Sequence, residues 1–212
     1  EQWGVDLLQR VRGMFTFVIW DKNKQELFGA RDHFGIKPFY YAKMNGTFMY
    51  ASEIKSLLRH PDFVKELNAE ALKPYMTFQY PAIGETFFKG VYKLPEGHYF
   101  TYRDGKMDIH RYYDEDFREG KQKLGELVNS IDQTVCDSVK AHQIADVEVG
   151  SFLSSGVDSS YVAAVARPQH TYSIGFGKGT YNESQQAGEL AELLKLNNTA
   201  ESLTDEEAFA AF

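Results

Sequence analysis

Cysteine is nearly absent from the sequence: Cys136 is the single cysteine among 212 residues. A disulfide framework and a metal site built from several cysteines are therefore excluded for these residues. Cys136 lies in a helical pattern of apolar residues, with no histidine beside it. We expect its thiol to be buried and to serve packing alone.

Long apolar runs and an excess of positive charge are lacking as well. The longest apolar runs, 15–20 and 161–166, reach about a third of the length that spans a bilayer. Acidic residues outnumber basic ones by 30 to 23, which gives a net charge of -7. A surface of this sign attracts neither nucleic acid nor anionic lipid. We expect a cytoplasmic protein with no nucleic-acid and no membrane partner.

Aromatic residues, by contrast, are abundant, with 16 Phe, 13 Tyr and 2 Trp. Such a composition favours half-buried β-strands over a purely helical bundle. From residue 13 to 112 the apolar positions recur with a period of two, and Asn45-Gly46 is a strong hairpin signal. The predicted strands cover 14–20, 26–30, 39–43, 47–51, 98–102 and 107–112.

These strands predict an α+β fold with antiparallel sheets. We expect the first four to form one meander and the last two a separate hairpin. A short amphipathic helix is predicted over 1–12, and four prolines predict an irregular chain over 61–97. Trp3 and Trp20 are candidates for the core.

The pattern changes after a charged segment at 114–122, which we interpret as a linker. A long amphipathic helix is predicted over 124–144. Strands and helices then alternate, which is typical of βαβ units in a parallel sheet. The predicted elements are strands at 147–153, 171–175 and 199–203 and helices from 160 to 166 and from 183 to 196. Thr204 and Glu207 predict the start of a further helix.

A polar loop, Ser154–Ser160, follows the first of these strands. In an open parallel sheet, ligands bind where the carboxyl ends of the strands meet the following helices. Hydroxyls, a glycine and a helix N-terminus together favour a bound phosphate. Asp158 would repel phosphate, so we expect it either as an N-cap or as a ligand of a Mg²⁺ ion that the phosphates bring. The alternative is that these residues only cap a helix after a tight turn.

Two known nucleotide or nucleophile motifs do not describe this loop. No lysine stands where a Walker A loop needs one, and the Gly-x-Ser-x-Gly pattern of a nucleophile elbow is absent. Residues 138–160 (SVKAHQIADVEVGSFLSSGVDSS) instead resemble the entry to the synthetase domain of glutamine-hydrolysing asparagine synthases. The related ATP pyrophosphatases carry Ser-Gly-Gly-x-Asp-Ser at this loop.

Four upstream motifs resemble the second half of the same family's N-terminal glutaminase domain. They are GMFTF at 13–17, ARDHFGIKPFYY at 30–41, ASEIKSL at 51–57 and KLPEGHY at 93–99. The resemblance implies part of an N-terminal-nucleophile glutaminase sandwich over 1–113, a linker at 114–122, and an α/β domain over 123–212. The second domain is expected to resemble the adenine nucleotide alpha-hydrolases.

The resemblance also implies which residues bind ATP and its pyrophosphate. The positions that match the family's loop are Ser154, Ser155, Gly156, Asp158, Ser159 and Ser160. Leu153 and Ile174 match positions that contact adenosine, and Glu183 matches an acidic residue near the phosphates. Asp158 is expected to reach Mg²⁺ through the pyrophosphate. Ser155 replaces the first glycine of the motif. If that position requires positive φ, serine costs about 1 kcal/mol or more; otherwise it adds a hydrogen-bond donor, which we favour.

The implied reaction has two steps in the synthetase domain. An aspartate carboxylate attacks the α-phosphate of ATP to give β-aspartyl-AMP and pyrophosphate, and ammonia from glutamine then displaces AMP. In the family the glutaminase nucleophile is a leading cysteine, upstream of the motif that here begins at Gly13. We therefore expect no catalytic residue within these 212 residues, which look like an internal fragment that is inactive alone. A homodimer is compatible with the resemblance.

Two other interpretations stay open. A relative such as a β-lactam synthetase would adenylate a different acid, and a non-catalytic module would keep the fold for assembly or regulation. We expect Arg31 and Asp32 to brace a loop between strands instead of lining the glutamine site. The sequence does not specify the acceptor acid.

Overall fold

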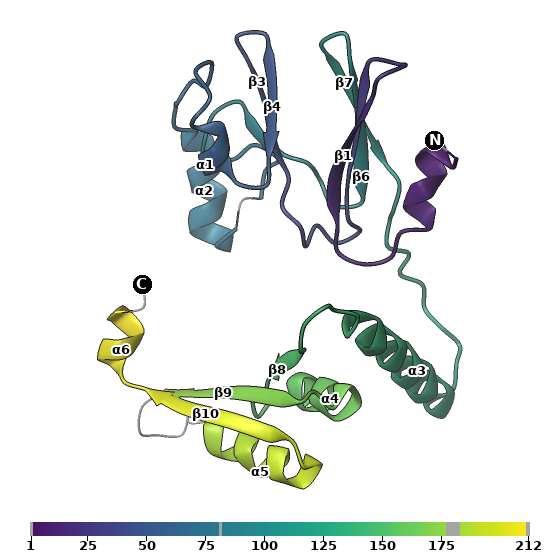
Figure 1. The fold of residues 1–212 in the computed structure, drawn as a ribbon, viewed down its shortest axis with the longest axis vertical. Helices are drawn as coiled ribbons and strands as arrows, with labels where there is room; N and C mark the ends of the chain where they lie inside the picture. Colours follow the sequence, from purple (N-terminus) through teal and green to yellow (C-terminus); the bar gives the residue numbers. More distant parts are fainter. Residues whose placement is uncertain (1, 81, 177–182, 211–212) are drawn as a thin grey trace. The chain divides into compact units, whose positions relative to one another are not determined.

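The computed structural model describes residues 2–80, 82–176 and 183–210. The chain divides into two compact units, Glu1–Arg118 and Glu119–Phe212 (Figure 1). Each unit is described by itself.

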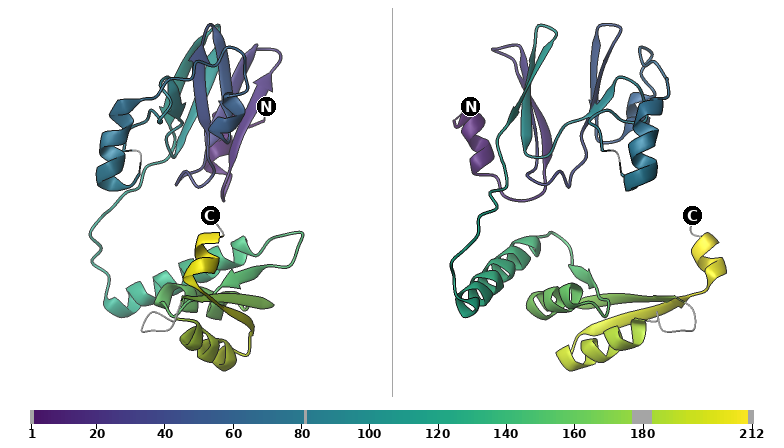
Figure 2. Two further views of the ribbon diagram at one scale, coloured as in Figure 1. Left: turned by 90° about the vertical axis from the view of Figure 1, so that its left-hand side faces the viewer. Right: turned by 180° about the vertical axis from the view of Figure 1, so that it is seen from behind.

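The first unit contains two antiparallel sheets that pack on each other (Figures 1 and 2). One sheet has the order β1-β2-β6-β7, with β1 (Thr16–Asp21), β2 (Glu26–Arg31), β6 (His98–Arg103) and β7 (Lys106–Arg111). The other has the order β4-β3-β5, with β3 (Tyr40–Met44), β4 (Thr47–Ala51) and β5 (Val91–Lys93). A 3-10 helix, η1 (Gly4–Gln9), and two α-helices, α1 (Ile54–Leu57) and α2 (Ala69–Phe78), complete the unit.

Aromatic side chains fill the space between the two sheets. Phe39, Leu94 and Phe100 are fully buried there. Phe48 of β4 stacks on Tyr102 of β6, with ring centroids 4.2 Å apart. The abundance of aromatic residues thus serves a sandwich core, since such rings bury large apolar areas and pack well on pleated surfaces.

Three predictions for this unit are wrong. The chain over 61–97 is not irregular throughout, because α2 lies within it. The first four strands do not form one meander, because the chain crosses to the other sheet between β2 and β3. Trp3 and Trp20 are not core residues, since they are 45% and 47% exposed. Trp20 is the second-to-last residue of β1, which is an edge strand of its sheet. The Trp3 ring lies under the guanidinium of Arg10, whose central carbon is 5.1 Å from the ring centroid.

The second unit is built on a parallel sheet, as predicted. Its order is β10-β9-β8, with β8 (Gly150–Phe152), β9 (His170–Phe176) and β10 (Asn197–Leu203). The helices are α3 (Leu124–His142), α4 (Val157–Ala166), α5 (Ser184–Leu194) and α6 (Asp205–Ala210). The predicted capping box is confirmed: Thr204 and Glu207 exchange hydrogen bonds at the start of α6.

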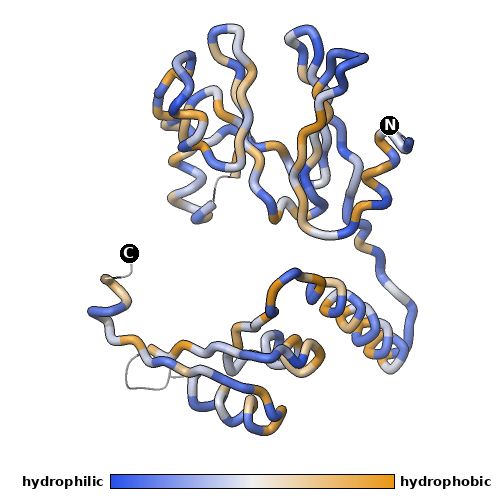
Figure 3. Tube along the Cα trace, viewed as in Figure 1, coloured by the Kyte–Doolittle hydropathy of each residue, from blue (hydrophilic) through white to orange (hydrophobic). Residues whose placement is uncertain are grey.

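The core of the second unit is small. Leu153, Ala163, Ala187 and Ala191 are buried between the sheet and the helices α4 and α5. The helix α3 contains no buried residue, although apolar positions recur along it (Figure 3). The prediction that Cys136 is buried is therefore wrong. Its side chain is half-buried, because the rest of the unit covers only part of the apolar stripe of α3. Among the described residues, no helix is both long and apolar enough to cross a bilayer.

Candidate functional site: a serine-rich loop at the end of β8

The predicted polar loop lies at the carboxyl end of β8 and leads into α4. Gly156 is the N-cap of α4, with φ -71° and ψ 150°. The first intrahelical bond runs from the Ser160 N–H to the Gly156 carbonyl, at 3.1 Å. No side chain caps this helix end in the described structure. The N–H groups of the first turn are therefore left to water or to a ligand, and they carry the positive end of the helix dipole.

Serine hydroxyls brace this loop from within. The Oγ atoms of Ser154 and Ser159 lie 2.8 Å apart, and Ser154 Oγ accepts the Gly156 N–H at 3.2 Å. The Ser159 and Ser160 hydroxyls both donate to the Gly156 carbonyl, at 3.1 Å and 2.7 Å. The loop therefore keeps its shape without using the first-turn N–H groups. Side-chain capping would have used them, so the serine hydroxyls and Asp158 do not cap α4, and Gly156 alone is its N-cap.

Gly156 leaves room for the Ser154 hydroxyl, and its backbone conformation does not itself need glycine. Its φ is negative, and a Cβ built at this position would lie 3.3 Å from Ser154 Oγ. Ser155 is exposed and is not among the described residues with positive φ. Serine therefore causes no strain at the position where the family motif has glycine, and its hydroxyl adds a donor at the mouth of the loop.

Asp158 lies in the first turn of α4, with an exposed side chain. It is not the N-cap, so one of the two roles expected for it is excluded. A carboxylate in the first turn is stabilised by the helix dipole. No group of three or more acidic, histidine or cysteine side chains that could hold a metal occurs among the described residues. A Mg²⁺ ion at Asp158 would therefore take most of its ligands from phosphate oxygens and water, which is how Mg²⁺ is usually held.

Leu153 and Ile174 lie on opposite faces of the sheet. Leu153 is 3% exposed and packs on Ala163 and the α5 alanines, so only its backbone can touch a ligand. Ile174 of β9 is 47% exposed, on the face that α4 and α5 do not cover. The Ile174 side chain is therefore accessible to a ligand on that face, as are those of Tyr172 and Phe176.

Glu183 is the N-cap of α5, at the carboxyl end of β9, and its side chain is exposed. The carboxyl ends of adjacent parallel strands meet at one edge of a sheet, so Glu183 and the loop share that edge. Within the described residues no hydrogen bond joins Glu183 to the loop. The structure thus brings the serine residues together, whereas Glu183 shares their edge of the sheet without a described bond to them.

In the first unit, Arg31 and Asp32 brace the loop between β2 and β3, as predicted. Arg31 is 2% exposed. Its guanidinium donates to the carbonyls of Lys37 and Leu94, both at 2.7 Å, and to that of Gly35. The Asp32 carboxylate accepts the N–H groups of Ile36 and Lys37 at 2.9 Å. Burial lowers the pKa of Arg31 from its usual value.

Comparison with known proteins identifies both parts of the chain. The sequence model of the glutamine amidotransferase domain matches residues 1–113, which is more than half of the chain. The chain belongs to the glutamine amidotransferase domain family. The asparagine synthase model matches residues 130–212 of this amidotransferase chain. The resemblance drawn from the motifs is therefore confirmed.

Curated relatives of this amidotransferase chain include several asparagine synthetases. Asparagine synthetase [glutamine-hydrolyzing] 1 of Bacillus subtilis is 39% identical over 93% of this chain and 32% of its own length. A putative asparagine synthetase of Mycobacterium bovis is 36% identical over 99% of this chain and 34% of its own length. Amidase chry2 of Gibberella zeae is 33% identical over 78% and 25%. The chain spans about a third of the length of the two synthetases.

Among solved structures, a glutamine phosphoribosylpyrophosphate amidotransferase from B. subtilis, complexed with ADP and GMP, is similar over 92% of this chain and 34% of that chain. The TM-score is 0.32 and the identity is 14%, so this likeness carries no argument. The fold is instead described from the antiparallel and parallel sheets of this chain itself.

One contact near the serine-rich loop was not predicted. The Tyr161 hydroxyl of α4 donates to Asp132 Oδ1 of α3. The two residues are 29 positions apart, and no short motif joins them. Only the position of Tyr161, directly after the loop, offered a signal.

Proposed function

We propose that the protein containing this chain makes asparagine from aspartate in an ATP-dependent reaction, with ammonia released from glutamine. Residues 1–113 would be the later part of the glutaminase domain, 114–122 the linker, and 123–212 the first part of the synthetase domain. The supporting observation is the self-braced serine-rich loop, with free N–H groups, inside a segment that matches the asparagine synthase model.

The loop is suited to hold the pyrophosphate that leaves ATP. Developing negative charge is stabilised by donors that are fixed in advance, since they need no reorganisation during the reaction. The first-turn N–H groups of α4 are such donors. The Ser155 hydroxyl is exposed at the loop surface and can add a further bond. Ser154 and Ser159 would serve mainly to hold the loop in shape.

Other residues would complete the ATP site. Asp158 would bind Mg²⁺, which would supply positive charge to the phosphates when bound. Ile174 and the backbone of Leu153 would contact adenosine, and Glu183 would act near the phosphates. The acid would be activated as β-aspartyl-AMP, so that AMP and pyrophosphate are the products. In such a reaction the protein acts mainly through positioning and charge stabilisation.

The ammonia would come from the amidotransferase part. Glutamine hydrolysis of this class needs a nucleophile activated by a nearby base. Cys136 lies on α3 of the second unit and does not fit this role. We propose that the nucleophilic cysteine lies outside these 212 residues, and that this chain by itself is inactive. A homodimer and a cytoplasmic location stay predictions.

Binding measurements on the full-length protein test the ATP site. Mg-ATP and Mg-pyrophosphate should bind, and Ser159→Ala should weaken both about two- to tenfold, because it removes hydrogen bonds that each contribute about 0.5–1.5 kcal/mol. Ser151→Ala is the control, since the Ser151 hydroxyl bonds only to the neighbouring Phe152 carbonyl among the contacts described. Equal affinities in all three proteins, or no binding by the parent protein, would refute the site.

A second experiment identifies the acid. The amidase among the relatives shows that this sequence pattern is not confined to proteins named as asparagine synthetases. Amide formation should therefore be measured with aspartate and with a panel of other carboxylic acids. Turnover of aspartate and of no other acid supports the proposal. Turnover of another acid instead of aspartate would refute asparagine as the product and leave the proposed ATP site standing.

A further inference from the structure

The serine-rich loop leads directly into α4, so the position of its backbone depends on the position of that helix. On one side α4 is held by packing: Ala163 is buried against Ala187 and Ala191 of α5. On the other side α4 contacts α3, where side-chain hydrogen bonds add to the packing.

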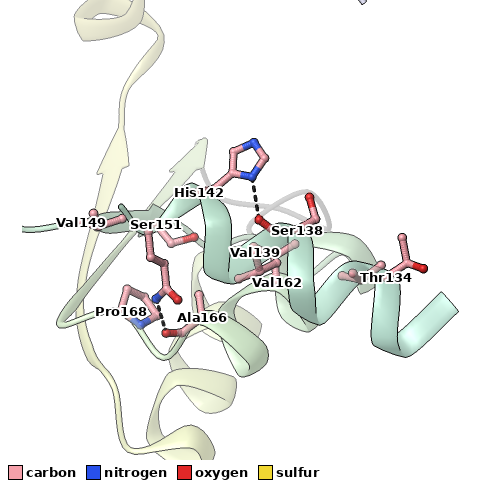
Figure 4. A pocket seen from close by; sticks show the side chains of 12 residues that line it. Thr134, Ser138, Val139, His142, Val149, Ser151, Val162, Ala166 and Pro168 are labelled. Atoms are coloured by element: carbon pink, nitrogen blue, oxygen red, sulfur yellow. Dashed lines mark hydrogen bonds between the residues drawn. The ribbon is translucent and has the colours of Figure 1, made fainter. Parts of the chain in front are cut away.

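A groove of about 520 Å³ opens beside the contact between α3 and α4, and residues of both helices and of 149–151 line it. Figure 4 shows Val139 of α3 and Val162 and Ala166 of α4 among its lining residues. The helices α3 and α4 contact each other elsewhere along their length. At this groove the small side chains leave a gap, so dispersion contributes little to fixing the spacing there.

Two described hydrogen bonds link α4 to α3 and to Gln143, the residue that ends α3. Near the start of α4, Tyr161 donates to Asp132. Near its end, Gln143 Nε2 donates to the Ala166 carbonyl at 2.6 Å (Figure 4). With a rise of 1.5 Å per residue, Tyr161 lies about 6 Å along the axis from the first residue of α4, and Ala166 lies about 13 Å from it. The Tyr161 bond is thus the one close to the loop.

We propose that Tyr161, held by Asp132, is a positioning residue that sets the orientation of the α4 N-terminus and hence of the pyrophosphate loop. The inference rests on the proposed ATP site. Tyr161 follows the last serine of the loop directly and would not itself touch the phosphates. Loss of its hydroxyl frees the first turn of α4 to tilt toward the groove, which misaligns the N–H donors.

The protonation states suit this contact. The hydrogen bond to Asp132 raises the pKa of Tyr161 to about 12. The phenol therefore stays a donor throughout the neutral range. Cys136 Sγ lies 3.8 Å from the same Asp132 oxygen and adds a weak second contact.

The test is a double-mutant cycle in the full-length protein, with Mg-pyrophosphate binding and steady-state kinetics in Mg-ATP as readouts. Tyr161→Phe keeps the ring and removes the hydroxyl, and Asp132→Leu removes the acceptor. Each should raise the pyrophosphate Kd and the KM for ATP about three- to tenfold, with kcat at saturating ATP unchanged. The double variant should be no worse than either single variant, because both remove one contact.

Two further variants separate positioning from general stability. Asp132→Asn keeps an oxygen acceptor and should restore near-normal affinity. Thr134→Val is the matched control, because its hydroxyl donates within α3, to the Ser130 carbonyl, and does not reach α4. Additive effects in the cycle, or a lower Tm with unchanged affinity, would overturn the proposal. Failure of the parent protein to bind Mg-pyrophosphate would instead overturn the proposed ATP site.

Discussion

Replacing Arg31 by methionine tests whether the brace between β2 and β3 holds the first unit together. Methionine fills a similar volume but donates no hydrogen bond. Three carbonyls lose the Arg31 donor, although that of Lys37 keeps a long bond of 3.4 Å from the Thr16 hydroxyl. The carbonyl of Leu94 lies beside a fully buried side chain. An unsatisfied buried polar group costs about 1–3 kcal/mol, whereas relief of the buried charge offsets part of this loss.

The expected net loss is about 3–5 kcal/mol of the free energy of unfolding, because three carbonyls lose a charged donor at about 1–3 kcal/mol each. Since domains are stable by about 5–15 kcal/mol, the variant should unfold at a clearly lower urea concentration. Urea denaturation followed by circular dichroism measures the difference. Arg103→Met is the matched control, because Arg103 is exposed and pairs only with exposed Asp104, so about 0.5 kcal/mol or less is expected. A loss below about 1 kcal/mol for Arg31→Met would refute the reasoning.

Two further predictions concern backbone conformation and pH. Gly188→Ala should raise the free energy of unfolding by about 0.5–1 kcal/mol, because Gly188 lies inside α5 with open space around it, whereas Gly46→Ala, equally open but at φ +82°, should lower it by about 1 kcal/mol. Urea denaturation of both variants decides this, and the same sign for both would contradict it. Burial raises the pKa of Tyr112 to about 12 from 10 in the unfolded chain, so its contribution is present below pH 10 and is lost as the pH rises from 10 to 12. The urea midpoint should fall less steeply over that range in Tyr112→Phe than in the parent chain, and identical slopes would count against this assignment.

Local patterns predicted most elements of the chain, because those elements depend on neighbouring residues. The strand at Thr47–Ala51 and the capping box at Thr204 follow from alternation and from hydrogen bonds three residues apart. The choice of sheet for β3 and β4 depends on contacts between residues far apart in the chain, and the Arg31 bond to the Leu94 carbonyl, 63 positions away, is one of these. The helix α2 was missed because Pro74, read as an interruption, lies inside it.

The same division applies to the candidate site. The serine residues of the loop are contiguous, so the motif predicted their grouping, although the motif did not say whether they cap the helix or brace the loop. The opposite placement of Leu153 and Ile174 depends on which face of the sheet the helices cover. The Asp132 contact depends on how α3 and α4 pack. Packing of this kind is not encoded in a local pattern.

The central claim is that the serine-rich loop serves an ATP pyrophosphatase reaction that activates aspartate. The most direct measurement is the identity of the nucleotide product when the full-length protein turns over Mg-ATP, with and without aspartate, and with either ammonia or glutamine. The account predicts AMP and pyrophosphate, formed only with aspartate and from both nitrogen sources. Formation of ADP and phosphate, or no nucleotide turnover under any of these conditions, would contradict it.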